Sequence, residues 1–278
     1  MTQPISVTKA DGSIELFDVR KLQRSLKRAG ATQNEINSIV TAVEHTLTEG
    51  ITTQQIYRHA FELLRGHQTP VAARYSMRRA LFSLGPSGFP FEDFLARLFE
   101  AEGYTTRTRV ELKGKCALHE LDVAAWNATD SFVVEAKFHA HPGIKSDLQV
   151  AMYSYARLLD LREQRICRQD ICGIKNLVLA TNTKFTKAAE KYALCTGLSI
   201  LSWDYPKNNS LQDRIDRAGI YPITALTTLS QSDKRKLLEN GFILCDDLVL
   251  RPNEAMALGI SSKKLDTAII ESRQLRSQ

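Results

Sequence analysis

The sequence has few cysteines, and they follow no recognisable spacing. The 278 residues include five, and no two of them are separated by just two residues. An odd number without a Cys-x-x-Cys pair argues against a disulfide framework and against a structural zinc site. The five are Cys116, Cys167, Cys172, Cys195 and Cys245.

Three further patterns are missing. No apolar run approaches the roughly 20 residues that a membrane-spanning helix needs, and Met1–Pro4 is not followed by the basic and apolar regions of a signal peptide. We therefore expect a cytoplasmic protein that is not in a membrane. No Gly-x-x-x-x-Gly-Lys-Ser/Thr loop occurs, so a bound nucleotide is expected to be sensed and not used to drive a motor.

The composition is that of a folded protein with a basic surplus. Hydrophobic residues make up 43% and charged residues 24%, which makes disorder an unlikely main state. Lys and Arg outnumber Asp and Glu by 37 to 31. A surplus of this sign favours polyanions such as nucleic acid, because cations neutralise phosphates, but many basic proteins never bind nucleic acid.

Residues 1–85 are predicted to form a small domain of one hairpin and several helices. Two short alternating runs flank Asp11-Gly12, a strong hairpin signal. Helical spacing follows, with Thr52 or Thr53 as a helix cap and a last helix over Val71–Leu84. The Gly- and Pro-rich stretch that begins at Gly85 then predicts a domain boundary.

Residues 86–208 change period repeatedly, as expected for an α/β core with a mixed sheet. One helix is predicted near the start, and strands and helices then alternate. The predicted helices cover 90–102, 145–161 and 186–196, and the predicted strands cover 105–113, 119–126, 131–139, 176–180 and 198–203.

Residues 209–278 contain no further strand signals and are predicted to form a helical region. The fold class is therefore multidomain α/β with a helical C-terminal region. The short helices are predicted over 211–218, 223–229, 232–240, 246–250, 252–258 and 262–273.

Three residues in the central region form a candidate catalytic set. Asp122 interrupts one apolar strand, and Glu135 and Lys137 interrupt the next. Residues two apart on a strand share a face, so Glu135 and Lys137 should project together. If the two strands pair as a hairpin, Asp122 can lie opposite Glu135. Two adjacent carboxylates repel unless a cation lies between them, and Mg²⁺ prefers oxygen ligands.

This set also has a simpler interpretation. For a Glu-x-Lys sequence alone, a surface ion pair is the more common explanation. The acid in the preceding strand, the strand–turn–strand spacing and the acidic Glu92 on the preceding helix favour a phosphodiester-hydrolysing site. His119 is a candidate general base but is more typical of a packing residue. His139 and His141 are more typical of a solvated loop.

Residues 86–206 resemble the PD-(D/E)xK nuclease superfamily, specifically Mrr-like restriction endonucleases. The resemblance rests on Glu-Leu-Asp122, Glu135-Ala-Lys137, Phe91-Glu92 and the run from Gln149 to Tyr153. It implies a restriction-endonuclease-like fold in which Asp122 and Glu135 bind Mg²⁺, or alternatively Mn²⁺, and Lys137 is catalytic. It further implies that Glu92 adds a ligand or supports the site and that Gln149 contacts DNA or the site backbone.

Residues 5–84 resemble the ATP-cone domain, a regulatory module of ribonucleotide reductases. The match includes Val7-Thr8-Lys9, Asp11-Gly12, Gly50–Thr53 and Ala72–Tyr75. The resemblance implies that ATP or dATP is a regulatory ligand. The residues it implies as nucleotide contacts are Val7, Lys9, Glu15, Lys21 and Thr53. The alternative is that this domain keeps the fold but contacts DNA or protein.

Residues 223–273 look like helix-hairpin-helix modules. Gly241 and Gly259 stand where tight turns would join two helices, and Lys263 and Lys264 follow the second turn. In such modules the N–H groups of the turn meet a phosphate. A small packing domain with helix-capping glycines is the alternative.

These patterns together predict a metal-dependent DNA endonuclease regulated by ATP or dATP, acting in restriction, defence or repair. A homo-oligomer would suit it, because cutting both strands usually requires two active sites. One alternative is a catalytically inactive, nucleotide-responsive DNA-binding regulator on a nuclease fold. Another is a hydrolase of RNA or free nucleotides.

Overall fold

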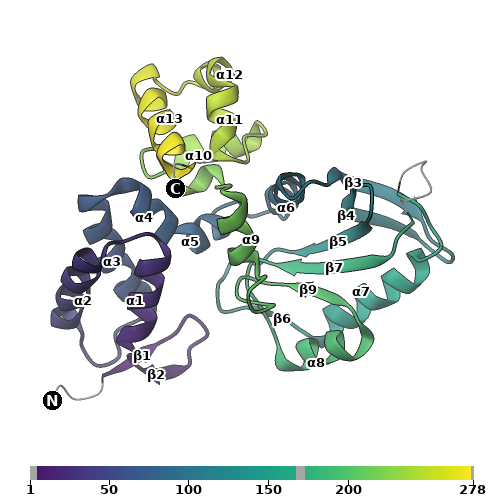
Figure 1. The fold of residues 1–278 in the computed structure, drawn as a ribbon, viewed down its shortest axis with the longest axis horizontal. Coiled ribbons are helices and arrows are strands. Elements are labelled where there is room, and N and C mark those ends of the chain that lie inside the picture. Colours follow the sequence, from purple (N-terminus) through teal and green to yellow (C-terminus); the bar gives the residue numbers. More distant parts are fainter. Residues whose placement is uncertain (1–4, 167–172, 277–278) are drawn as a thin grey trace. The chain divides into compact units, whose positions relative to one another are not determined.

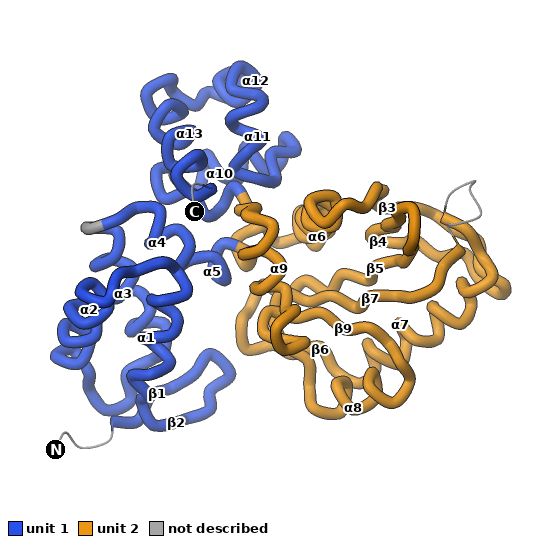
Figure 2. Tube along the Cα trace, viewed as in Figure 1, with its two compact units in different colours: residues 1–80, 223–278 blue, residues 81–222 orange. Residues whose placement is uncertain are grey.

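The computed structural model describes residues 5–166 and 173–276. These residues form two compact units, 1–80 with 223–278 and 81–222 (Figure 2). The predicted third region is thus divided, since 209–222 belong to unit 2 and 223–278 to unit 1. Cys116, Cys195 and Cys245 are free thiols, whereas Cys167 and Cys172 lie outside the described residues. No helix in the described ranges is long and apolar enough to cross a membrane.

The first part of unit 1 is the predicted hairpin followed by helices (Figure 1). Strands β1 and β2 pair in antiparallel fashion around the Asp11-Gly12 turn, and Gly12 has a φ of 78°, which favours glycine. The expected helix over 71–84 is instead two helices that meet at Ser76, whose hydroxyl donates to the carbonyl of Ala73 at 2.9 Å. The elements are β1 (Ser6–Thr8), β2 (Ile14–Leu16), α1 (Val19–Arg28), α2 (Gln33–Thr46), α3 (Thr53–His67), α4 (Thr69–Tyr75) and α5 (Met77–Phe82).

The second part of unit 1 contains the predicted short helices. Gly241 and Gly259 both have left-handed φ angles, 74° and 83°, as expected where a glycine ends a helix. Helix α13 packs against α4 and α11, and the Thr224 hydroxyl donates to the carbonyl of Ala80 at 2.7 Å. The elements are the 3₁₀ helix η2 (Ile223–Ala225), α10 (Gln231–Glu239), α11 (Cys245–Leu250), α12 (Pro252–Ala257) and α13 (Ser262–Arg276).

Unit 2 is built on a five-stranded mixed sheet in the order β3-β4-β5-β7-β9. Strand β4 pairs in antiparallel fashion with β3 and with β5, and β7 and β9 continue parallel to β5. The strands are β3 (Thr105–Lys113), β4 (Leu118–Trp126), β5 (Ser131–Lys137), β7 (Asn176–Thr181) and β9 (Ser199–Leu201). The α/β class and the mixed sheet predicted from the sequence are confirmed.

Helices cover the sheet of unit 2. Helix α6 packs on β3 and β4 through its apolar face, while α7 packs on β7 and α8 on β9 (Figure 1). The expected helix over 145–161 begins at Leu148, because Asp147 caps it and Lys145 and Ser146 pair with Lys184 and Phe185 as β6 and β8. The helices are α6 (Phe89–Ala101), α7 (Leu148–Leu161), α8 (Lys187–Thr196) and α9 (Leu211–Ala218).

Candidate functional site

Asp122 is held against the neighbouring strand by its own carboxylate. The β4–β5 ladder runs from Trp126↔Ser131 to Val123↔Val134, and one further step in this register brings Asp122 opposite Glu135. The ladder stops there, and the backbone N–H of Ala136 donates instead to Asp122 Oδ2 at 2.6 Å. The carboxylate thus replaces a backbone carbonyl and lies next to the two polar residues of β5.

Glu135 and Lys137 project from the same face of β5, as their spacing predicts. Lys137 Nζ lies 3.1 Å from Glu135 Oε1. The lysine side chain is 39% exposed and the glutamate side chain only 6%. The ammonium group of Lys137 is therefore accessible to a molecule in solvent, whereas the carboxylate of Glu135 is buried.

The pKa of Asp122 is raised because its side chain is partly buried beside Glu135. Burial is the larger cause that raises it, and the negative charge of Glu135 is the second, so that it reaches about 6. The hydrogen bond from Ala136 and the charges of Arg157 and Lys137 oppose the rise. A carboxylate whose ionisation is disfavoured by a neighbouring carboxylate lies in a site that a cation would stabilise.

Glu92 lies close enough to Asp122 for the negative charge of Asp122 to raise the pKa of Glu92. It occupies the first turn of α6, is buried, and has a pKa raised to about 7 by burial first and by Asp122 second. Arg109 offsets part of this effect, with Nη1 3.4 Å from Glu92 Oε2 and Nη2 2.8 Å from Asp93 Oδ1. The charge of Asp122 on β4 therefore acts on Glu92 of α6.

The sheet is irregular where these acids gather. Arg109 has a φ of 54°, in the left-handed region, and is skipped in the ladder between Thr108↔Val123 and Val110↔Leu121. The residue that faces it across this gap is Asp122. Irregular strand positions of this kind occur often near functional sites, where they redirect side chains.

Arg157 is a site residue that the sequence pattern did not reveal. From α7 its Nη1 donates to Glu135 Oε2 and, at 3.1 Å, to the carbonyl of Glu120. Its Nη2 donates to the Tyr153 hydroxyl at 2.9 Å. The only signal in the sequence is spacing, because Tyr153 and Arg157 are four residues apart and so share a helix face.

The remaining polar candidates lie elsewhere in unit 2. Gln149 is exposed in the first turn of α7. His119 is 2.7 Å from Asp160 Oδ2, the carboxylate that also accepts from the N–H groups of the β3–β4 turn. His139 is 3.0 Å from the Ser146 hydroxyl. Both histidines thus have structural partners. This agrees with the packing interpretation of His119, whereas His139 is half-buried and not part of the solvated loop that the sequence suggested.

The acidic pair has the right chemistry for a hard divalent cation. Its donors are carboxylate oxygens, and Mg²⁺ commonly uses only one or two carboxylates together with waters. It is not a complete protein cage, because the described parts of the chain contain no group of three His, Cys, Asp or Glu residues arranged to hold a metal. Any bound cation would therefore complete its shell with water or substrate oxygens.

The candidate nucleotide contacts of unit 1 gather around one carboxylate. Lys9 Nζ lies 2.6 Å from Glu15 Oε2, and Lys21 Nζ lies 3.0 Å from Glu15 Oε1. These two lysines lower the pKa of Glu15, with Lys9 as the larger cause. Val7 is 3% exposed within the core, so only its backbone can meet a ligand.

Thr52, not Thr53, caps the third helix of unit 1. Its hydroxyl accepts from the N–H of Gln55, whose side chain in turn accepts from the N–H of Thr52. Thr53 is the first residue of α3, and Thr8 bridges to Thr52. The start of α3 therefore lies beside the hairpin that carries Lys9 and Glu15.

Comparison with known proteins places both parts of unit 1. Residues 5–81 match the ATP cone domain, and residues 221–276 match the domain described as AF1548-like, C-terminal. An uncharacterized protein of Archaeoglobus fulgidus is 34% identical over 182 residues, which cover 65% of this chain and 99% of the relative. The chain belongs to the AF1548-like family. The expected ATP-cone domain at the N-terminus is confirmed.

One solved structure agrees with this AF1548-like assignment. The crystal structure titled as the protein of unknown function AF1548 superposes with a TM-score of 0.56 at 31% identity, covering 68% of this chain and 98% of that one. Can2 from Sulfobacillus thermosulfidooxidans in complex with cyclic tetra-adenylate reaches a TM-score of only 0.28 at 14% identity, covering 72% of this chain and 52% of that one.

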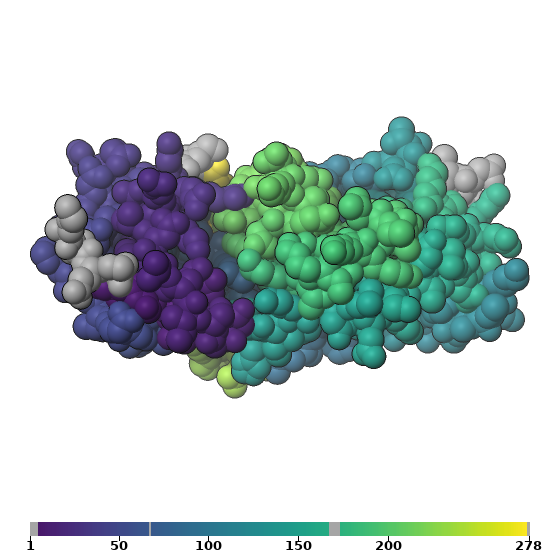
Figure 3. Space-filling view, turned by 90° about the horizontal axis from the view of Figure 1, so that it is seen from below, coloured from purple at the N-terminus to yellow at the C-terminus, as the bar shows by residue number. Residues whose placement is uncertain are grey.

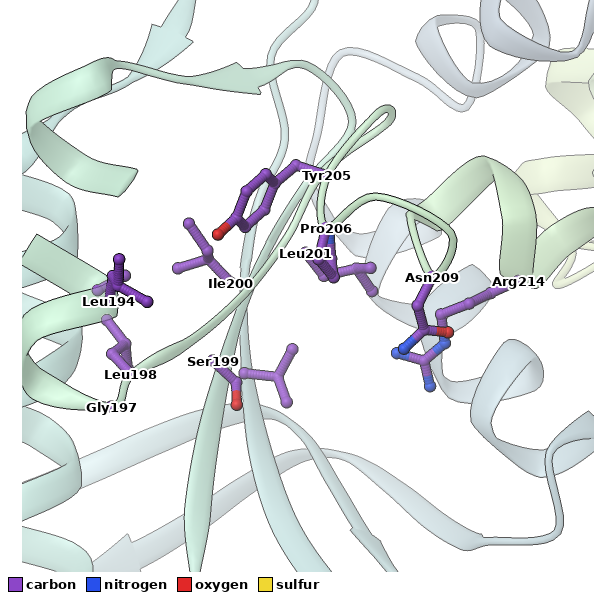
Figure 4. A pocket seen from close by; sticks show the side chains of 12 residues that line it. Leu194, Gly197, Leu198, Ser199, Ile200, Leu201, Tyr205, Pro206, Asn209 and Arg214 are labelled. Atoms are coloured by element: carbon purple, nitrogen blue, oxygen red, sulfur yellow. The ribbon is translucent and has the colours of Figure 1, made fainter. Parts of the chain in front are cut away.

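The AF1548-like protein also has a largely apolar pocket in unit 2. It lies beside the edge strand β9 and the following loop, and contains none of the predicted site residues (Figure 4). Figure 4 shows Tyr205 and Ile200 on one side and Asn209 and Arg214 on the other. Arg214 is engaged by Glu102 at 2.7 Å, so the pocket has little charge to offer a ligand.

Proposed function

We propose that this AF1548-like protein is a divalent-metal-dependent DNA endonuclease regulated by ATP or dATP. The observation that carries the proposal is the arrangement at β4 and β5. Asp122 is fixed by the N–H of Ala136 at 2.6 Å, beside Glu135 and its partner Lys137 at 3.1 Å. An acidic pair of one buried and one partly buried carboxylate, with a solvent-accessible ammonium group beside it, suits hydrolysis of a phosphodiester.

Each side chain has a distinct role in this proposal. Asp122 and Glu135 would hold Mg²⁺ or Mn²⁺, and the cation would supply Lewis acidity toward a phosphate oxygen and a more acidic water. Lys137, which is 39% exposed, would donate to the phosphate oxygens as negative charge builds on them. Glu92 would support Asp122 from α6, and Gln149 would contact DNA from α7.

Arg157 would act as a positioning residue. It holds Glu135 from α7 and is itself fixed by the carbonyl of Glu120 at 3.1 Å and the hydroxyl of Tyr153 at 2.9 Å. A carboxylate held in this way keeps one orientation at little entropic cost. The arrangement therefore favours a preorganised site.

The regulatory part of the proposal rests on the ATP cone domain over residues 5–81. Lys9, Glu15 and Lys21 form a charged cluster at the hairpin of this domain. Lysines can contact the phosphates of ATP or dATP, while Glu15 keeps them oriented. The regulatory ligand would act on a DNA-directed enzyme of restriction, defence or repair.

One observation favours a second function, a nucleotide-responsive DNA-binding regulator without catalysis. Both oxygens of Glu135 have cationic partners, Arg157 and Lys137. A carboxylate already neutralised in this way needs no metal. In this second function Glu135, Arg157 and Lys137 would stabilise the fold of unit 2. Asp122 would serve only as a hydrogen-bond acceptor for the backbone.

Incubation of supercoiled plasmid with Mg²⁺, Mn²⁺ or EDTA tests the proposal. We expect nicking or linearisation with either metal and none with EDTA. Asp122→Asn and Lys137→Ala should each lower the rate by about 100-fold or more, with unchanged DNA binding. Asp204→Asn, at an exposed Lys184 ion pair, is the control and should cleave like the wild type.

The outcomes separate the two functions. Full cleavage by Asp122→Asn would place the active site elsewhere. DNA binding by the wild type without cleavage in either metal would favour the regulator. Parallel reactions with RNA and with free nucleotides identify the substrate class, since cleavage of RNA alone would contradict a DNA nuclease. Addition of ATP or dATP should change the rate of plasmid cleavage.

A further inference from the structure

The positive charge of this protein is concentrated in one short helix. Helix α1 (Val19–Arg28) contains five Lys and Arg residues and no Asp or Glu. The whole chain has a formal net charge of +6, so the rest of the molecule is nearly neutral. The five cations are Arg20, Lys21, Arg24, Lys27 and Arg28.

These cations lie on one face of the helix. Leu22 and Leu26 are buried and turn the opposite side to the core of unit 1. At about 100° per residue, all five basic positions fall within an arc of roughly 120° centred opposite the two leucines. All five are exposed, and the purple surface in Figure 3 belongs to this N-terminal part of the chain.

We propose that this exposed basic face of α1 binds the phosphate backbone of duplex DNA. Arg20 and Lys27 are seven residues apart, which spans about 10 Å along the helix. Each strand of duplex DNA carries one negative charge per about 3.4 Å of the helix axis. A row of cations of this length therefore matches several consecutive phosphates, and arginine can bind each of them bidentately.

Other anionic partners fit this face less well. Lys21 is already 3.0 Å from Glu15 in the candidate nucleotide cluster, whereas the other four cations of the row are not part of that cluster. A membrane-binding helix inserts its apolar face, but Leu22 and Leu26 of α1 are buried in the protein core. A long, regular polyanion is the partner that can contact all five cations of α1.

The inference extends the proposed DNA-directed function, but its test requires binding alone. The full-length protein is titrated against fluorescently labelled duplex DNA in EDTA, across a series of KCl concentrations. Arg20→Gln/Arg24→Gln/Lys27→Gln removes three cations and keeps good helix-forming residues. Lys187→Gln/Lys191→Gln/Lys207→Gln, at exposed positions of unit 2, removes the same charge elsewhere.

Each phosphate contact contributes about 0.9 to the slope of log affinity against log salt. We therefore expect the α1 variant to lower that slope by about two to three and to weaken binding at least about tenfold at moderate salt. The unit 2 variant should change affinity less than about twofold. Circular dichroism and thermal unfolding establish that both variants fold.

Three results would overturn the inference. Parallel salt plots for the wild type and the α1 variant would show that the helix makes no phosphate contacts. Equal losses in both variants would show an unspecific effect of net charge. Loss of binding to phosphatidylserine vesicles with unchanged DNA affinity would identify an anionic lipid surface as the partner. A failure of plasmid cleavage leaves this result unaffected, because the binding assay contains no metal.

Discussion

Asp122 Oδ2 accepts a hydrogen bond from the backbone N–H of Ala136 at 2.6 Å, at the point where the β4–β5 ladder ends. This bond fixes an acidic side chain beside Glu135, which lies one residue before Ala136 on β5. Because the carboxylate of Asp122 takes the place of a backbone acceptor, the pairing of β4 with β5 and the charge of the site depend on the same group. Several consequences can be measured.

Replacement of Asp122 by Asn should stabilise the protein at neutral pH without divalent cations. The pKa of Asp122 is raised to about 6, above the roughly 3.9 of an unfolded Asp. The folded state thus binds more protons than the unfolded state between about pH 4 and pH 6. The free energy of unfolding therefore falls as pH rises through this window, and Asp122→Asn avoids the loss.

Asn keeps an oxygen that can accept from Ala136, so the hydrogen bond is retained. We expect a gain of about 1–2 kcal/mol at pH near 7.5 and almost none at about pH 3, where the Asp is protonated in both states. Thermal unfolding in EDTA at both pH values measures this. A lower melting temperature for Asp122→Asn at neutral pH contradicts the electrostatic account. With Mg²⁺ present, the wild type should gain more stability than the variant.

Replacement of Arg157 by Met should destabilise the protein strongly. It leaves the carboxylate of Glu135, whose side chain is 6% exposed, with Lys137 as its remaining cationic partner. Removal of one partner of a buried ion pair costs about 3–5 kcal/mol in unfolding free energy. Urea unfolding measures the loss, and Tyr153→Phe, which removes one hydrogen bond, should cost about 1 kcal/mol or less.

The double variant Arg157→Met/Glu135→Gln provides the control for that experiment. If the loss comes from an uncompensated charge, removing the charge should recover much of the stability. Additive losses in the double variant would indicate lost packing by the arginine instead. The cleavage rate of Arg157→Lys should exceed that of Arg157→Met, because a lysine retains the positive charge beside Glu135.

Replacement of Gly114 by Ala should disrupt the docking of the β3–β4 turn onto α7. A Cβ at Gly114 would lie 2.1 Å from Asp160 Oδ2 and 3.0 Å from its backbone carbonyl oxygen. Asp160 accepts from the N–H of Cys116 at 2.7 Å and meets His119 at 2.7 Å, so it cannot move freely. We expect a loss of about 1–3 kcal/mol in unfolding free energy.

Gly66→Ala is the matched control for Gly114→Ala. Gly66 lies within α3, and a Cβ there would have no heavy atom within 4 Å. Because alanine favours a helix more than glycine does, this variant should gain about 0.5–1 kcal/mol. Urea unfolding of both variants measures the difference, and equal effects would show that the space around Gly114 is not what matters.

Lys9→Gln and Lys21→Gln should each weaken binding of ATP or dATP by about tenfold, because each removes a cation from the cluster around Glu15. Isothermal titration calorimetry measures this, with AMP as the ligand that lacks the outer phosphates. Lys27→Gln, on the same helix as Lys21 but outside the cluster, should bind ATP like the wild type. The absence of heat with every nucleotide would remove the regulatory proposal.

Local patterns in the sequence predicted much of this molecule. The alternation over 105–113, 119–126 and 131–139 corresponds closely to β3, β4 and β5, because half-buried strands repeat every two residues. The same rule placed Glu135 and Lys137 on one face, and their side chains are 3.1 Å apart. The catalytic and ligand-binding roles of these residues remain predictions that the experiments above test.

Other features depend on contacts between distant residues. Arg157 reaches Glu135 from 22 positions along the chain, and Asp160 holds a turn more than 40 positions earlier. No local period carries such information. The left-handed conformation of Arg109 could not be predicted from the sequence either, because an arginine within a strand pattern normally indicates regular extended backbone.

The amino-acid pattern alone was enough to predict the longer strands, most of the helices, the charge of α1 and the acidic residues of β4 and β5, but not the two-residue strands β6 and β8. Those features follow from side-chain periodicity and residue chemistry over a few neighbouring positions. Only the tertiary structure decided that Arg157 neutralises Glu135, that Asp122 bonds to Ala136 and that residues 223–278 form a unit with residues 1–80. The reason is that burial and charge pairing depend on which elements pack together, and packing is a property of the whole chain.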